Sequence, residues 1–148
     1  MLGAIRAEET PVKRLTALLL ALTLPLLASA KEEVEPKEGE APKVAYIDLV
    51  PALVGNYGPG PRLKYYKADI SLRVSSTDAE VKVTRHEPLI RNQLVMLFSQ
   101  QTDESLGSSD AKEKLRQEAL KQVQQVLNSE EGQPLVDDLL FNNLIIQP

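Results

Sequence analysis

Few side chains in this 148-residue chain could carry out chemistry. Cysteine is absent, which excludes disulfides, thiolate nucleophiles, iron–sulfur clusters and cysteine-based zinc sites. His86 is the only histidine, so a metal site built from several histidines is excluded as well. A carboxylate site for a hard cation stays formally open, but the acidic residues do not have the spacing of an EF-hand loop. We therefore expect no metal and no other cofactor.

His86 could in principle act as a general base or as a pH sensor. It stands at the predicted end of a helix, where a solvent-exposed histidine that interacts with the helix dipole is the more common arrangement. We expect neither a Gly-x-Ser-x-Gly motif nor a Ser-x-x-Lys motif to present a serine nucleophile. The sequence thus predicts a binding module and no catalytic residues.

Asp137 and Asp138 could bind a cation only if both carboxylates reached the same side of the chain. Adjacent residues of a strand point to opposite faces of the sheet, so they cannot share one ion without a bulge. We expect a structural role for both, and also for Gln147 at the end of the same predicted strand.

The overall composition is that of a folded, weakly acidic protein. Apolar residues make up 43% of the chain and charged residues 26%, which is ordinary for a globular domain. The net charge is −4 and no basic stripe is visible, although proteins that bind nucleic acids usually need one to neutralise phosphates. We therefore expect no nucleic-acid partner.

The N-terminal residues 1–30 have the three parts of an export signal. Lys13 and Arg14 precede the apolar run 15–30, which ends in the small residues Ala28-Ser29-Ala30. The run has 16 residues, whereas a helix that spans a membrane needs about 20. We expect a secretory signal over 13–30, cleaved to release a periplasmic protein; the alternative is an uncleaved anchor in the inner membrane. Two glutamates within residues 1–12 are unusual before a signal, and a mis-assigned start codon would explain them.

Residues 31–43 are charged and contain two prolines, so they predict a flexible linker ahead of a domain that covers 44–148. The domain opens with a predicted strand over 44–50. A connection rich in Gly, Pro and Asn follows over 52–62. The next segment, 63–74, alternates between apolar and polar residues, which is typical of a half-buried strand. Its predicted core face is formed by Tyr66, Ala68, Ile70, Leu72 and Val74.

The rest of the domain predicts helices followed by a last strand. Residues 75–78 form an N-cap cluster for a short helix that ends near His86, and Pro88 suits the first turn of the next helix, which extends to Gln100. A polar loop over 101–109 then leads to a helix capped by Ser109. The helical core faces are expected to be Ile90, Leu94, Leu97 and Phe98 in one helix, and Leu115, Ala119, Val123, Val126 and Leu127 in the other.

The last helix is expected to end near Asn128, before Gly132 and Pro134, and residues 135–147 return as a strand. This order predicts an α+β domain, in which two or three helices cover one face of a small, mainly antiparallel sheet.

Four short motifs follow one another through this domain. They are Leu63-Lys64-Tyr65-Tyr66-Lys67-Ala68, then His86-Glu87-Pro88-Leu89-Ile90-Arg91-Asn92, then Lys-Glu-Lys-Leu-Arg at 112–116, and a terminal segment from Leu140-Phe141 to Ile145-Ile146-Gln147. Each motif is weakly specific by itself. In this order and at these spacings, about 44–147 resembles the periplasmic domain of the FliL family of flagellar basal-body proteins.

The resemblance implies a domain similar to the stomatin (SPFH) fold that assembles around flagellar stator units. It implies a role in motor function and motility without catalysis, with the periplasmic region of the stator as partner and self-association into a ring or partial ring. Two features depart from the family pattern: the apolar run looks cleavable, and the usual Asn-Leu is represented only by Asn56-Tyr57. A FliL-like paralogue, or a periplasmic SPFH-like scaffold with no flagellar role, remains the alternative.

The candidate partner contacts are Arg91, Asn92, His86 and Tyr57. Arg91 lies in the motif by which the family is most easily identified, and it either holds its helix to the domain by a salt bridge or contacts another subunit. The second interpretation places the segment His86–Asn92 against the loop Gly55–Arg62 of a neighbour, where Tyr57 would pack on the guanidinium of Arg91.

Overall fold

A computed structural model describes residues 42–148. The export signal predicted at 13–30 and nearly all of the linker predicted at 31–43 lie outside the described residues. None of the helices between residues 42 and 148 has the length and hydrophobicity that a membrane crossing requires.

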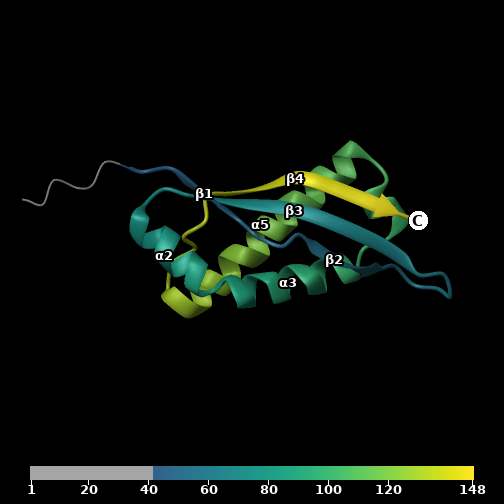
Figure 1. The fold of residues 1–148 in the computed structure, drawn as a ribbon, viewed down its shortest axis with the longest axis horizontal. Helices are drawn as coiled ribbons and strands as arrows, with labels where there is room; N and C mark the ends of the chain where they lie inside the picture. Colours follow the sequence, from purple (N-terminus) through teal and green to yellow (C-terminus); the bar gives the residue numbers. More distant parts are fainter. Residues whose placement is uncertain (1–41) are drawn as a thin grey trace, which may run out of the picture. The chain divides into compact units, whose positions relative to one another are not determined.

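The sheet is built around one long central strand (Figure 1). This strand, β3 (Lys64–Val74), pairs antiparallel with β4 (Asp138–Gln147) along one side. Along its other side, β1 (Ala45–Asp48) and β2 (Leu53–Tyr57) follow one another, also antiparallel to β3. β3 is therefore the only strand whose two edges are both paired within the described domain.

The predicted alternation of β3 is confirmed. All five residues of its predicted core face are at most 1% exposed, whereas Lys67 on the opposite face is exposed. Residues two apart in a strand point to the same face, so this pattern buries one side of the sheet. The other side is accessible to solvent except at Ser71, which is 5% exposed.

The predicted connection 52–62 was partly wrong, because it contains β2. Gly55 and Asn56 favour turns, but here Leu53 and Tyr57 turn inward and are 2% and 3% exposed. Gly55 lies directly opposite Tyr66 on β3. The Tyr66 side chain occupies the space that a Cβ at Gly55 would need, so the two residues fit together as a cross-strand pair.

Both flanks of β3 are interrupted at the same level. On the β4 side, the register shifts between Asp69 and Ile70, which leaves Asn142 as the extra residue of a β-bulge. On the other side, the four residues 49–52 separate β1 from β2, and the Leu49 N–H donates to the carbonyl of Ile70 at 2.9 Å. Because of the bulge, the core-facing residues of β4 are three positions apart at one point and two apart elsewhere. They are Leu139, Phe141, Leu144 and Ile146, which pair in this order with Leu72, Ile70, Ala68 and Tyr66.

The helices begin at the side-chain caps that the sequence supplies. The hydroxyl of Ser76 accepts from the N–H of Ala79 and caps the first helix, and Ser108 caps the long last helix through Ala111, one residue before the predicted Ser109. The segment 101–109, predicted as a loop, includes a short helix with a capping box at Thr102. The bounds are α2 (Thr77–Arg85), α3 (Glu87–Ser99), α4 (Asp103–Leu106) and α5 (Ser109–Glu131).

The helices and the sheet share one core. Figure 1 shows α5 running obliquely across the sheet. The predicted core residues of α3 are all buried, and those of α5 are buried except for Val126, which is partly exposed. At the centre, the Phe98 ring stacks on Tyr66 at 4.7 Å between centroids and meets Phe141 at 5.8 Å. The predicted α+β class is confirmed, while the likeness to the SPFH fold stays a prediction.

The Gly55–Tyr66 pair gives a test of this packing. In a Gly55→Ala variant the new Cβ would lie 2.8 Å from the Tyr66 hydroxyl oxygen and 2.9 Å from the ring. The ring cannot move easily because it is stacked on Phe98, so we expect the free energy of unfolding to fall by about 1–3 kcal/mol in a urea titration. Asn56→Ala, at the exposed neighbouring position, is the matched control and should change it by less than about 0.5 kcal/mol. Equal stability of the two variants would contradict the cross-strand pair.

Candidate functional site

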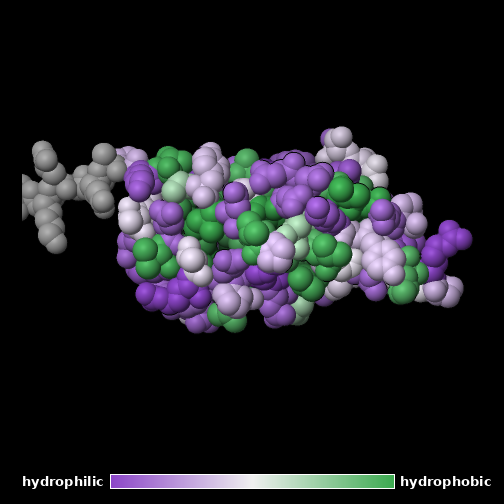
Figure 2. Space-filling model, in the orientation of Figure 1, coloured by the Kyte–Doolittle hydropathy of each residue, from purple (hydrophilic) through white to green (hydrophobic). Residues whose placement is uncertain are grey.

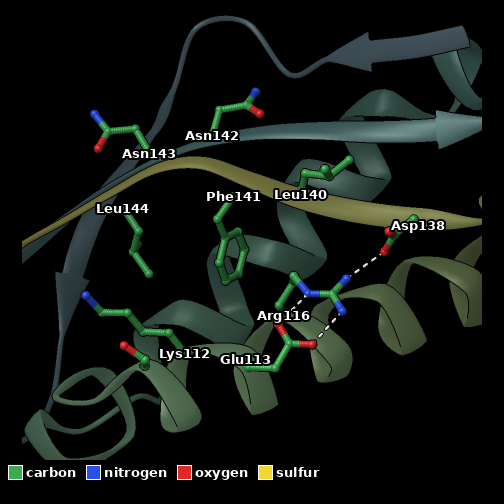
Figure 3. A pocket seen from close by; sticks show the side chains of 10 residues that line it. Lys112, Glu113, Arg116, Asp138, Leu140, Phe141, Asn142, Asn143 and Leu144 are labelled. Atoms are coloured by element: carbon green, nitrogen blue, oxygen red, sulfur yellow. Dashed lines mark hydrogen bonds and ion pairs between the residues drawn. The ribbon is translucent and has the colours of Figure 1, made fainter.

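A groove of about 580 Å³ lies between the first turns of α5 and β4 (Figure 3). One wall is helical and carries charged side chains, and the other is the strand itself with half-buried apolar side chains. Figure 3 shows the Phe141 and Leu144 side chains directed toward α5. The lining residues are Ser109, Lys112, Glu113 and Arg116 from α5, and Asp138 with Leu140–Leu144 from β4.

Arg116 joins the two walls of this groove. Its Nε and Nη2 donate to the two carboxylate oxygens of Glu113 at 2.8 and 2.6 Å, and its Nη1 donates to Asp138 at 2.6 Å. The hydrogen bond from Arg116 lowers the pKa of Glu113, and the Glu113 carboxylate in turn raises the pKa of Arg116. A guanidinium occupied in this way fixes α5 against β4 and has little capacity left to bind an external anion.

The same network covers the beginning of the free edge of β4. Arg116 Nη1 also donates to the carbonyl of Leu139 at 3.0 Å, and the N–H of Leu139 donates to the Asp138 carboxylate at 2.8 Å. Asp137 instead accepts a hydrogen bond from Ser75. The two adjacent aspartates therefore have different partners, which agrees with the structural role expected from their alternation. Beyond Leu139, no strand of the described domain pairs with this edge.

Two residues that line this groove could in principle supply a nucleophile and a base. Ser109 and Lys112 have a Ser-x-x-Lys spacing, so the expectation that no such motif is present was wrong. Within residues 42–148, no hydrogen bond joins their side chains, so the pair lacks the contact that activates a nucleophile. The same residues contain no group of three or more His, Asp or Glu side chains placed to hold a metal ion.

His86 is not the solvent-exposed cap that the sequence predicted. Its side chain is 15% exposed, and its Nε2 lies 2.6 Å from a carboxylate oxygen of Glu131 at the end of α5. Lys82 and Arg85 approach the same carboxylate at 4.0 and 3.9 Å. The predicted exposure of His86 was wrong because its partner, Glu131, lies 45 residues away in the chain. The contact holds the corner between α2 and α3 against α5.

Arg91 lies at the interruption between β1 and β2. Its Nη2 donates to the backbone carbonyl of Pro51 at 2.7 Å, and its Nη1 lies 3.7 Å from the Glu87 carboxylate. Pro51 lies between the end of β1 and the beginning of β2, where its carbonyl is not part of the strand pairing. The guanidinium of Arg91 therefore supplies the hydrogen-bond donor for this carbonyl. Of the two predicted roles, holding the helix to the domain is the one that these contacts support.

Tyr57 and Asn92 occupy opposite environments. Tyr57 is 3% exposed and its hydroxyl donates to Asp103 at 3.2 Å, while Lys64 forms an ion pair with the same carboxylate. The predicted packing of Tyr57 against the guanidinium of a neighbour is therefore wrong, because the ring is part of the core. Asn92 faces outward on α3, where its only side-chain hydrogen bond among the described residues is a weak one of 3.9 Å to the sulfur of Met96.

An exposed apolar surface on α3 was not predicted from the sequence. Leu89, Val95 and Met96 are 45%, 38% and 48% exposed, and Asn92 lies among them on the solvent side of the helix. We call these four residues the α3 surface. Elsewhere hydrophobic side chains are interspersed with hydrophilic ones on the face seen in Figure 2. The signal in the sequence was a set of apolar residues of this helix, Leu89, Val95 and Met96, that lie outside its predicted core face.

Comparisons with known proteins match nearly the whole of the described domain. A family model described as flagellar basal body-associated protein FliL matches residues 46–147, which span β1 to β4. The flagellar protein FliL of Aquifex aeolicus (strain VF5) is 30% identical to this chain over 114 residues. That alignment covers 73% of this chain and 68% of the Aquifex protein.

The role of Arg91 can be tested by its removal. Arg91→Ala leaves the Pro51 carbonyl without its partner, and we expect the free energy of unfolding to fall by about 1–2 kcal/mol in a denaturant titration followed by circular dichroism. Arg85→Ala, which removes a 64%-exposed guanidinium, is the matched control and should have a much smaller effect. If Arg91→Ala is as stable as the control, the guanidinium does not support the strand interruption.

The Glu113–Arg116 pair predicts a dependence of stability on acid. Because the folded-state pKa of Glu113 is lowered, its contribution to stability is present at neutral pH and is lost as the pH falls below about 4, through the folded-state value. Glu113→Gln should therefore lose less stability than the wild type between pH 5 and pH 2.5 in thermal melts. Glu130→Gln, at an exposed position with no ion pair among the described residues, should keep the wild-type acid dependence. Parallel curves for all three proteins would show that this pair does not contribute.

Proposed function

Because this chain belongs to the FliL family of flagellar basal body-associated proteins, we propose that it supports flagellar motor function and motility by binding the stator. The observation that carries this proposal is the extent of the family match, which includes every strand and helix of the described domain. In this proposal the domain lies in the periplasm at the inner membrane and catalyses no reaction. It acts by occupying surface on its partners.

The α3 surface is the part of the domain that we assign to the stator. It belongs to the motif His86–Asn92 and the turn that follows, so the most recognisable family segment both supports the fold and presents an outer face. His86 and Arg91 point inward and fix the helix to α5 and to the strand interruption. Asn92, Leu89 and Met96 are then held on a rigid helix, as an interface of a few apolar anchors around a polar group requires.

We further propose that the chain associates with copies of itself into a ring or partial ring around the stator. A ring needs heterologous contacts, in which one patch of each subunit meets a different patch of the next. The α3 surface is then left for the stator, and a separate pair of patches must join the copies.

The motor role is tested by swimming in soft agar. A strain that lacks the gene should swim poorly, and the full-length chain supplied from a plasmid should restore swimming. Met96→Glu, which places a charge on the α3 surface, should fold normally by circular dichroism but fail to restore motility. Val81→Glu changes a residue of similar exposure on α2, 54% against 48% for Met96, and is the matched control that should restore motility.

The outcomes separate two claims. A deletion strain that swims like the wild type would remove the motor role. Full rescue by Met96→Glu would leave the motor role intact and would show that the stator binds elsewhere.

A further inference from the structure

The sheet of the described domain has two unpaired edges. Within residues 42–148, β4 pairs only with β3, and β2 also pairs only with β3, so the outer edge of each strand has no strand beside it. Edge strands present unpaired N–H and C=O groups and readily add another strand unless they are protected. On β4 the Arg116–Asp138 network protects the edge at Leu139, which confines the available part to the residues that follow.

The two edges correspond to one another along the sheet. The bulge of β4 and the gap between β1 and β2 both lie at the level of Asp69 and Ile70 of the central strand. Beyond that level, the first four residues of β2 and the last four residues of β4 pair with the same stretch of β3, residues 65–68. Both segments are antiparallel to β3, so they run in the same direction as each other.

Side chains on the outer face of the sheet form two short cross-strand rows at this end. One row is Val54, Lys67 and Ile145, and the other is Asn56, Tyr65 and Gln147. Each row therefore ends in residues of the same kind at both edges: β-branched apolar residues in the first and amides in the second. Val54, Tyr65 and Ile145 are 64%, 44% and 42% exposed around a hollow of about 270 Å³. Apolar side chains from all three strands therefore meet on the open face of the sheet at this end.

We propose that a second copy of this chain occupies the β4 edge, with its β2 strand lying parallel to the last four residues of β4. The inference rests on the self-association in the proposed function and names the surfaces that join the copies. In this register Ile145 lies beside Val54 of the second copy, and Gln147 lies beside Asn56 of the second copy. Neighbouring β-branched residues and hydrogen-bonded amides are favourable cross-strand pairs.

The contact is heterologous, because the β4 edge of one copy meets the β2 edge of the next. The resulting pair still has one free β2 edge and one free β4 edge, each of which can bind a further copy. That is the arrangement that a ring requires. A strand of five residues buries less than the roughly 1,200 Å² typical of stable complexes, so one contact is weak and the assembly depends on repetition and on local concentration. The α3 surface is not used, and the stator could bind to each copy.

The absence of cysteine makes this contact directly measurable. In the double variant Val54→Cys/Ile145→Cys, every chain carries both halves of the contact. Oxidation of the purified full-length double variant at high concentration should give a ladder of dimers, trimers and larger species on non-reducing gels. Each single variant alone should remain monomeric, and an equimolar mixture of the two should give dimers and nothing larger. The matched control Val81→Cys/Ile145→Cys should give no ladder.

Two results would overturn the inference. Dimers from Ile145→Cys alone would show that two β4 edges meet about a two-fold axis. A double variant that gives no ladder, although chemical cross-linking of lysines detects oligomers of the wild type, would show that the copies meet through another surface.

Swimming separates this inference from the proposed function. If the deletion strain swims poorly but the double variant gives no ladder, only the strand contact is wrong. If the double variant gives a ladder but the deletion strain swims normally, the strand contact stands and the motor role is wrong.

Discussion

Every other strand of the sheet pairs with β3, and the helices pack on the face that its alternating apolar side chains form. Burying that face removes Tyr66, Ile70 and Leu72 from water, and hydrophobic burial of this kind is the main favourable term in folding. The Phe98 ring stacked on Tyr66 ties α3 to the sheet, and Phe141 brings β4 to the same cluster. The burial of one face of this strand therefore fixes the register of its neighbours and the side from which the helices approach.

Long polar side chains then fix the elements to one another at the margin of this core. Arg116 joins α5 to β4, Arg91 joins α3 to the strand interruption, and His86 joins the corner between α2 and α3 to α5. Each of these residues has a charge or a titratable group that could suggest a reaction or a ligand. Each of them has polar atoms bound to a partner within the domain and thereby holds the surfaces that surround it in place.

In our proposal, two separate surfaces remain for partners. The α3 surface presents apolar side chains around an amide on a rigid helix, which suits a protein partner such as the stator. The edges of the sheet present backbone groups and matching rows of side chains, which suit copies of the same chain. Since the two surfaces share no residue, binding of the stator and association of the copies can occur together. A protein that bridges a motor component and its own assembly requires this separation.

The sequence alone determined those strands and helices in which the spacing of apolar residues indicates the buried face. The alternation of residues 63–74 predicted β3, and the helical spacing of Ile90, Leu94 and Phe98 predicted the core face of α3. The tertiary structure decided whatever depends on a residue far away in the chain. Gly55 lies in a strand directly opposite the Tyr66 ring, and Tyr57 and His86 turn inward to Asp103 and Glu131, which lie 46 and 45 residues further along the chain. A local pattern records how often a residue is buried along its own element, whereas a hydrogen bond or a cross-strand contact depends on where the fold brings its partner.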